Sequence, residues 1–280
     1  IIVGSFFLPG GNDLYNFYLP FAGGCLNCGF VPYFARWVLV PLTWLPSDLV
    51  WPVLVIVSLV ILLLTCRYIG HNPLWLLLSF PTLSMIWLGQ IDALIIAGLA
   101  IALLASSPWL RGVGLSLAAI KPQIAGLAII VLLAHERGSN LLKILVAPIV
   151  VGVVSLLIFG LDWPFLWLAN ASQVPLHAYQ LDVVDPLPYL LAPLIFLFQG
   201  RQGKLRAALL ITTMASPYFG LYSYTVPLSF GIPGWGVLLS FIWPLAYISG
   251  THLLRLVWIF PIALLVHQYI QERHNRFPKN

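Results

Sequence analysis

Long apolar stretches separated by short polar or charged turns follow one another along the whole chain. Residues 49–66, 93–105 and 144–159, for example, contain no charged residue and no apolar–polar alternation with a period of two. Because lipid offers backbone groups no partner, such runs favour membrane helices over the strands of a barrel. A span needs about 20 apolar residues, and fewer where it is re-entrant, so the length predicts about nine to twelve membrane segments. We therefore predict an all-α, polytopic transmembrane helical fold in which some segments are short or re-entrant.

The composition agrees with this pattern. Hydrophobic residues make up 61% of the chain and charged residues 8%, whereas soluble domains carry about a quarter charged residues. Residues 1–280 are expected to form a single transmembrane helical domain. Because the chain starts at Ile1 inside an apolar stretch, part of an N-terminal helix is expected to be missing. The formal charge of +5 comes largely from loop residues, so it predicts orientation in a membrane and not nucleic-acid binding.

The positive charges predict which loops face the cytoplasm. Ten of the thirteen Lys and Arg residues fall in five loops, which the positive-inside rule places in the cytoplasm together with the C-terminus. The opposite side then receives residues 10–46 and residues 162–186, both rich in aromatic residues. We expect an integral protein of the bacterial inner membrane. The five loops comprise residues 67–71, 106–111, 135–143, 200–206 and 271–280.

Two short polar clusters interrupt the apolar middle of the chain: residues 89–92 (Gly-Gln-Ile-Asp) and residues 121–123 (Lys-Pro-Gln). A charged side chain at the centre of a membrane helix costs about 2.5–3.5 kcal/mol on insertion scales, so Asp92 and Lys121 need compensation. Each cluster lies between two of the cytoplasmic loops, so the chain around it must cross outward and return. We therefore expect two hairpins of short helices, each with one of the clusters at its tip.

The side chains of the two clusters allow two interpretations. Gln90, Asp92, Lys121 and Gln123 together offer donors, acceptors and charge for binding an anion or the hydroxyl groups of a sugar. Alternatively, Asp92 and Lys121 form a structural ion pair that holds the two hairpin tips together. The two interpretations are compatible, because an ion pair beside a cavity can also bind phosphate.

Asp13 directly follows the first apolar segment, in the sequence Gly-Gly-Asn-Asp-Leu-Tyr. A carboxylate at the outer membrane interface can act as a general base. The alternative is a solvated turn or a helix N-cap, for which Asn and Asp are well suited.

Further polar residues on the outer side are candidates for contacts with phosphate or hydroxyl groups. Ser216 and Tyr218 begin a group of hydroxyl-bearing residues near the outer end of a late helix, although an aromatic belt alone explains most such tyrosines. His177 lies in an acidic, aromatic loop, where a solvated role is the alternative. Arg255 is an isolated cation on the outer side.

Cys25 and Cys28 form a CxxC motif in the first outer loop. No second CxxC is present and no His follows, so neither a four-Cys zinc site nor a c-type haem attachment fits. A local disulfide suits an oxidising face of the membrane. The chain has no Walker loop, dinucleotide fingerprint, HExxH or GxSxG motif, so no metal or cofactor is expected.

Taken in order, these motifs resemble the polytopic GT-C glycosyltransferases, in particular the mannosyltransferase-like proteins of glycosyltransferase family 87. The similar pieces cover most of the chain, although the family often has Asn where this chain has Asp92. They are Asp13-Leu14-Tyr15 with Tyr18, Pro41-Leu42, Leu45-Pro46, Gly89-Gln90-Ile91-Asp92, the stretch from Gly112 to Lys121-Pro122, and Ala215-Ser216-Pro217-Tyr218 with Tyr222 and Tyr224.

This resemblance implies transfer of a mannose-like sugar from a polyprenyl-phosphate donor to a lipid or glycan acceptor, on the extracytoplasmic face and without a metal. Asp13 is then expected to take the proton of the acceptor hydroxyl. Lys121, Gln90 and Arg255 are expected to stabilise the negative charge that develops on the departing lipid phosphate. The expected partners are this donor and the surrounding membrane lipids.

Two other classes of protein fit parts of the pattern. A secondary transporter also uses broken helices around a central ionic site. A non-catalytic membrane subunit of a larger complex is the third interpretation.

Overall fold

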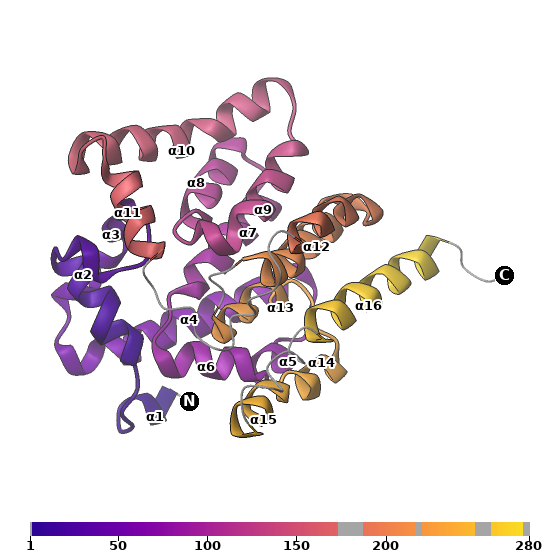
Figure 1. Ribbon diagram of the computed structural model, residues 1–280, viewed down its shortest axis with the longest axis horizontal. Coiled ribbons are helices and arrows are strands. Elements are labelled where there is room, and N and C mark those ends of the chain that lie inside the picture. The colour runs from indigo at the N-terminus through magenta and orange to yellow at the C-terminus, as the bar shows by residue number, and fades with distance from the viewer. Residues whose placement is uncertain (1, 173–186, 217–219, 250–258, 277–280) are drawn as a thin grey trace. The chain divides into compact units, whose positions relative to one another are not determined.

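The chain is described by a computed structural model for residues 2–172, 187–216, 220–249 and 259–276 (Figure 1). Every element in these ranges is a helix, so the predicted all-α fold is confirmed. The part before the first long helix contains only short elements, and long apolar helices follow it. The elements up to residue 88 are α1 (Ile2–Ser5), the π-helix η1 (Leu14–Tyr18), α2 (Leu19–Gly23), the 3₁₀-helices η2 (Leu26–Cys28) and η3 (Tyr33–Ala35), α3 (Arg36–Leu39), the 3₁₀-helix η4 (Val40–Trp44), α4 (Ser47–Ile69), α5 (Pro73–Leu77) and α6 (Phe80–Leu88).

The remaining elements range from short turns of helix to the long helix α10. Proline occupies the first position of α8 and α9, where its missing N–H costs no hydrogen bond. They are α7 (Asp92–Leu104), α8 (Pro108–Ala118), α9 (Pro122–Ala134), α10 (Gly138–Phe159), α11 (Trp163–Ser172), the 3₁₀-helix η5 (Leu187–Leu197), α12 (Gly200–Ala215), the 3₁₀-helix η6 (Leu221–Tyr224), α13 (Thr225–Leu228), α14 (Gly234–Leu239), α15 (Ile242–Ser249) and α16 (Ile259–Arg276).

Two of the described helices, α4 and α10, are long and apolar enough to cross a membrane. The pair α6 and α7 qualifies as a third span only if it counts as one segment, because it is bent by 119° at its break. Most of the other described helices are shorter than a full span, in line with the expected short or re-entrant segments. In α10, 11% of the most apolar window is buried, so most of this helix is open to its surroundings along at least one face, as a lipid-facing helix is.

The chain forms two compact units, each built from several separate segments. The first unit contains Ile1–Leu64, Ser84–Pro122 and Arg137–Pro175, and the second contains Thr65–Leu83, Gln123–Glu136 and Leu176–Asn280. The expectation of a single domain stays a prediction.

Helices α7 and α8 pack tightly against each other in the first unit. A Cβ atom added to Gly98 would lie 2.5 Å from the backbone nitrogen of Ala118, and one added to Gly114 would lie 2.6 Å from that of Ala102. These pairs run in opposite directions along the two helices, so α7 and α8 are antiparallel. Small residues at such positions let membrane helices approach backbone to backbone.

A short turn joins these two helices. Ser107 precedes Pro108 at the first position of α8, and the Arg111 side chain closes the turn by donating from Nε to the carbonyl oxygen of Ala105 at 2.7 Å. Because the helices are antiparallel and of similar length, the start of α7 at Asp92 and the chain just after α8 at Lys121 come to the same end of the pair.

In the second unit, α12 packs against η5 and α16, and α14 packs against α5 and α16. Its core includes the ring of Tyr224, whose centroid lies 4.5 Å from that of Trp243 and 5.8 Å from that of Phe260. Tyr224 is 3% exposed, which accounts for one of the late tyrosines by packing.

A histidine–arginine contact lies in the same unit, in the turn between α4 and α5. His71 Nε2 is 3.1 Å from Arg206 Nη2 and 3.1 Å from the carbonyl oxygen of Phe230. Burial and the neighbouring charge of Arg206 lower the pKa of His71, against the opposing effect of the Phe230 carbonyl. His71 is therefore held as the neutral imidazole near pH 7.

Candidate functional site

The break between α6 and α7 forms the centre of the site. Gly89 has a φ of +72°, a conformation that glycine adopts readily and other residues rarely do. The amide of Gln90 still donates to the carbonyl oxygen of Met85 at 3.0 Å, and α7 then begins at Asp92. The first polar cluster is thus a helix break, as the sequence predicts.

A close backbone contact brings the segment that carries Asp13 onto this break. The amide of Gly11 donates to the carbonyl oxygen of Trp87 at 2.8 Å. A Cβ atom on Gly89 would lie 2.9 Å from the Cα atom of Gly11, so only glycine allows this approach. Trp51 of α4 supports the contact from the side, because its indole Nε1 donates to the carbonyl oxygen of Ile86 at 2.9 Å.

Lys121 and Asp92 form a salt bridge that is shielded from water. Asp92 is 0% and Lys121 4% exposed. Lys121 Nζ also donates to Gln90 Oε1 at 2.8 Å, and it lies 5.7 Å from the centre of the Tyr18 ring. The expected proximity of Asp92 and Lys121 is confirmed, and the structural ion pair is present.

The amide of Gln90 has only one orientation that fits its neighbours. Its Oε1 accepts from Lys121 Nζ and from the hydroxyl of Tyr18, the latter at 2.6 Å. An ammonium group can only donate, so the oxygen must face Lys121 and the Nε2 must face the other way. There Nε2 donates to Oδ2 of Asp13.

Asp13 is consequently held by amide donors on both of its oxygens. Oδ2 accepts from Gln90 Nε2 and Oδ1 accepts from Asn12 Nδ2 at 3.0 Å, while Asn16 in turn donates to Asn12 Oδ1 at 2.9 Å. Asp13 stands at the N-cap position of η1, yet its side chain makes no capping hydrogen bond. The N-cap alternative is therefore not what the structure describes. Asp13 is half-buried, so its carboxylate is fixed in orientation and still reachable.

The model of glycosyltransferase family 87 matches residues 32–184, which is more than half of the 280 residues. The chain belongs to glycosyltransferase family 87. This family 87 protein is therefore a transferase enzyme and, with its apolar helices, a membrane protein. No curated protein matches it, and no solved structure does.

The family 87 match covers only part of the site. Gln90, Asp92 and Lys121 lie inside the matched range, whereas Asp13 and Tyr18 precede it. The structure brings all five together within the first compact unit.

Other residues expected in the site of the enzyme are not part of this network. Gln123 belongs to the second compact unit, where its Oε1 is buried without a hydrogen-bond partner. Ser216 also belongs to that unit and ends α12, its amide donating to the carbonyl oxygen of Thr212 at 2.9 Å. His177, Tyr218 and Arg255 lie outside the described residues, so their roles stay predictions.

Tyr18 is part of a motif in the family resemblance, and the structure adds it to the site. Asn12 and Asn16 also belong to the network, although neither is predicted as a site residue. The signal was present in the spacing: Asn12 and Asn16 are four residues apart and so share one face of a helical turn. Tyr18 is buried, and its hydroxyl had to find a partner.

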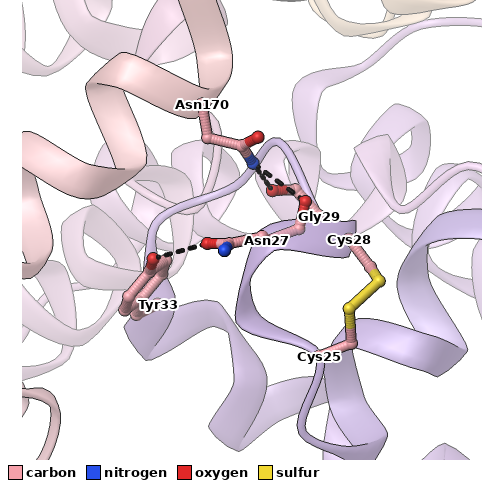
Figure 2. Close-up of a disulfide and its surroundings, with 6 residues drawn as sticks. All are labelled: Cys25, Asn27, Cys28, Gly29, Tyr33 and Asn170. Atoms are coloured by element: carbon pink, nitrogen blue, oxygen red, sulfur yellow. Dashed lines mark hydrogen bonds between the residues drawn. A yellow bond between two sulfur atoms is a disulfide. The ribbon is translucent and has the colours of Figure 1, made fainter.

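A disulfide between Cys25 and Cys28 stabilises the loop that follows this network (Figure 2). Figure 2 shows Asn170 of α11 reaching this loop, where its Nδ2 donates to the carbonyl oxygens of Asn27 and Gly29, each at 3.1 Å. The hydroxyl of Tyr33 donates to Asn27 Oδ1 at 3.3 Å. In this family 87 enzyme, the hydrogen bonds of Asn170 thus connect the first predicted outer loop with the predicted outer segment that follows α10.

Proposed function

We propose that this family 87 enzyme transfers a mannose-like sugar from a polyprenyl-phosphate donor to a lipid or glycan acceptor, with Asp13 as the general base. The observation that carries the proposal is the position of the Asp13 carboxylate. It is half-buried, oriented by Gln90 and Asn12, and placed beside a helix break within an apolar region. A fixed, reachable carboxylate is what proton transfer from an acceptor hydroxyl requires.

The hydrogen bonds of Asp13 leave acceptor positions on its carboxylate open for the acceptor hydroxyl. A carboxylate has about four acceptor positions, and Asn12 and Gln90 use one on each oxygen. An acceptor hydroxyl donates to a remaining position and passes its proton to Asp13 while its oxygen bonds to the anomeric carbon. The bond from that carbon to the lipid-phosphate oxygen breaks, and the phosphate leaves with the bonding electrons. A single displacement of this kind inverts the anomeric configuration.

The sequence suggested that Lys121 stabilises the departing phosphate, but the contacts of Lys121 in the structure favour another role. Its ammonium group is buried and paired with Asp92. This pairing favours a positioning role, in which Lys121 holds the Gln90 amide toward Asp13, over direct contact with the donor phosphate. Arg255 is kept as the proposed phosphate-binding cation.

Charge distribution and the disulfide support an extracytoplasmic site. In α4 the acidic Asp48 lies at the start of the helix and the basic Arg67 lies near its end. The order of charges is reversed in α10, where the basic Lys143 lies near the start and the acidic Asp162 follows the end. Both spans therefore agree with one orientation under the positive-inside rule, in which Arg67 and Lys143 face the cytoplasm. The disulfide lies in the same predicted outer segment as Asp13, and disulfides persist in oxidising compartments such as the bacterial periplasm.

The bent pair α6 and α7 is the observation that favours a transporter, because transporters place ionic sites at broken helices. Membership of a glycosyltransferase family favours transfer instead.

The test is Asp13→Asn in the purified, lipid-reconstituted chain, supplied with radiolabelled polyprenyl-phosphate mannose and a lipid acceptor extract. We expect turnover to fall by roughly 10²–10⁴-fold, the usual contribution of a general base, while donor binding persists because the amide keeps the size of the carboxylate and its oxygen still accepts from Gln90 Nε2. Asp48→Asn is the matched control, since Asp48 is an exposed carboxylate at the start of α4. Near-normal turnover by Asp13→Asn would refute the base assignment.

A further inference from the structure

A second polar site lies within the second compact unit. A pocket of about 440 Å³ opens between the start of α12 and the latter part of α16. Its walls carry four glutamines, one arginine and one glutamate. They are Gln199, Gln202 and Arg206 on the α12 side, and Gln268, Gln271 and Glu272 on α16.

The framework of this pocket is held by hydrogen bonds that fix the orientation of Gln268. Its Nε2 donates to the carbonyl oxygen of Gly203 and to Glu272 Oε1, each at 2.9 Å. Both partners are acceptors, so the amide cannot be reversed. The other carboxylate oxygen of Glu272 accepts from the backbone amide of Gln199 at 2.7 Å.

Two polar atoms of the pocket residues are left without partners. Gln268 is 3% exposed, and its Oε1, turned away from Gly203 and Glu272, is buried with no hydrogen bond. Arg206 donates from Nη2 to the carbonyl oxygen of Phe230, but its Nε is buried and unpaired. Buried polar atoms are nearly always paired, so one acceptor and one donor at a single pocket point to a ligand.

We propose that this pocket binds a neutral, hydroxyl-rich ligand of the sugar class. A hydroxyl group donates and accepts at once, which is what Gln268 Oε1 and Arg206 Nε together require. The positive charge of Arg206 and the negative charge of Glu272 balance each other, so neither an anion nor a cation is favoured. Gln202 and Gln271 add carboxamides that both donate and accept along the rim. The site shares no residue with the Asp13 network, so the proposal is independent of the proposed function.

The test is photo-crosslinking of the full chain with a diazirine-bearing methyl mannoside. The chain is held in phospholipid nanodiscs, because the headgroup of an alkyl-glycoside detergent would compete for the pocket. We expect mass spectrometry to find label in peptides that cover residues 199–206 and 268–272, and excess free mannose to reduce that label at least tenfold. Label elsewhere only, or label in these peptides that phosphate displaces and mannose does not, overturns the proposal.

Variants separate this pocket from the Asp13 site and from a general loss of folding. Gln202→Ala and Gln271→Ala remove rim carboxamides and leave the hydrogen bonds of Gln268 and Glu272 intact, so each should reduce the label several-fold. Asn140→Ala, which removes an exposed carboxamide in the first unit, should not. Asp13→Asn should also leave the label unchanged. Loss of the label in that variant, or its persistence in both rim variants, contradicts the assignment of the pocket.

Discussion

Removal of both partners of the Asp92–Lys121 pair should cost clearly less stability than the sum of the two single losses. Lys121→Met keeps the length of the side chain but leaves the Asp92 carboxylate, which is 0% exposed, without its salt bridge. Asp92→Asn leaves Lys121, which is 4% exposed, with Gln90 Oε1 and a neutral amide. Breaking a buried pair from one side costs about 3–5 kcal/mol. We expect Lys121→Met near the upper end and Asp92→Asn near the lower end, because an amide oxygen can still accept from Lys121.

The double variant isolates the interaction between the two charges. With neither charge present, no buried ion lacks a partner, so its loss of stability should fall short of the sum of the single losses by about 1–3 kcal/mol. The measurement is the free energy of unfolding of the reconstituted chain, followed by tryptophan fluorescence as a denaturing detergent is titrated into mixed micelles.

A second ion pair supplies the control for this cycle. Arg201 Nη2 and Glu136 Oε1 are 3.0 Å apart, and 21% of the Arg201 side chain and 7% of the Glu136 side chain are exposed. Because solvent reaches the Arg201 side of this pair and screens its charges, its coupling should be weaker than that of Asp92 and Lys121. If the losses at Asp92 and Lys121 add to within about 0.5 kcal/mol, the two charges act independently and the reasoning is wrong.

Three further predictions test other contacts. Tyr18→Phe removes one buried hydrogen bond to Gln90, so the free energy of unfolding should fall by about 1 kcal/mol. Turnover should also fall, with little change in the KM for the donor, and unchanged turnover would show that Tyr18 is not part of the site. Gly98→Ala should lower the free energy of unfolding by about 1–3 kcal/mol, because the new Cβ atom meets the backbone of Ala118. Gly126→Ala is the control and should be neutral or stabilising, because there is open space around its Cβ atom. Equal effects of the two variants would contradict the close packing of α7 and α8. The pKa of His71 is lowered in the folded chain, so the unfolded chain binds the proton first as the pH falls. The free energy of unfolding from chemical denaturation should therefore drop between pH 7.5 and pH 5.5, and it should drop by less in His71→Gln. Identical pH profiles of the two proteins would contradict a neutral His71.

Local pattern was enough to predict the all-α fold and the positions of the helix breaks. Apolar runs specify helices wherever lipid leaves the backbone no other partner. The cluster at residues 89–92 contains a glycine and a charged residue, and both interrupt an apolar run. A disulfide between Cys25 and Cys28 was compatible with their separation of three positions, and the structure shows that it forms.

The partners that link the Asp92–Lys121 pair to the first segment of the chain were decided by tertiary structure. Gln90 is 72 residues from Tyr18 and 77 from Asp13, and no local pattern relates positions so far apart, whereas its contact with Lys121, 31 residues away, follows from the expected meeting of the two hairpin tips. Their meeting depends on the glycine contacts that allow α7 and α8, and the backbones of Gly11 and Gly89, to approach. Gln123 shows the converse, since it directly follows the Lys121 turn but packs into the other compact unit. The sequence by itself therefore determined which polar residues needed compensation and that Asp92 and Lys121 could compensate each other, whereas backbone approach in three dimensions determined that Gln90 connects this pair to Tyr18 and Asp13.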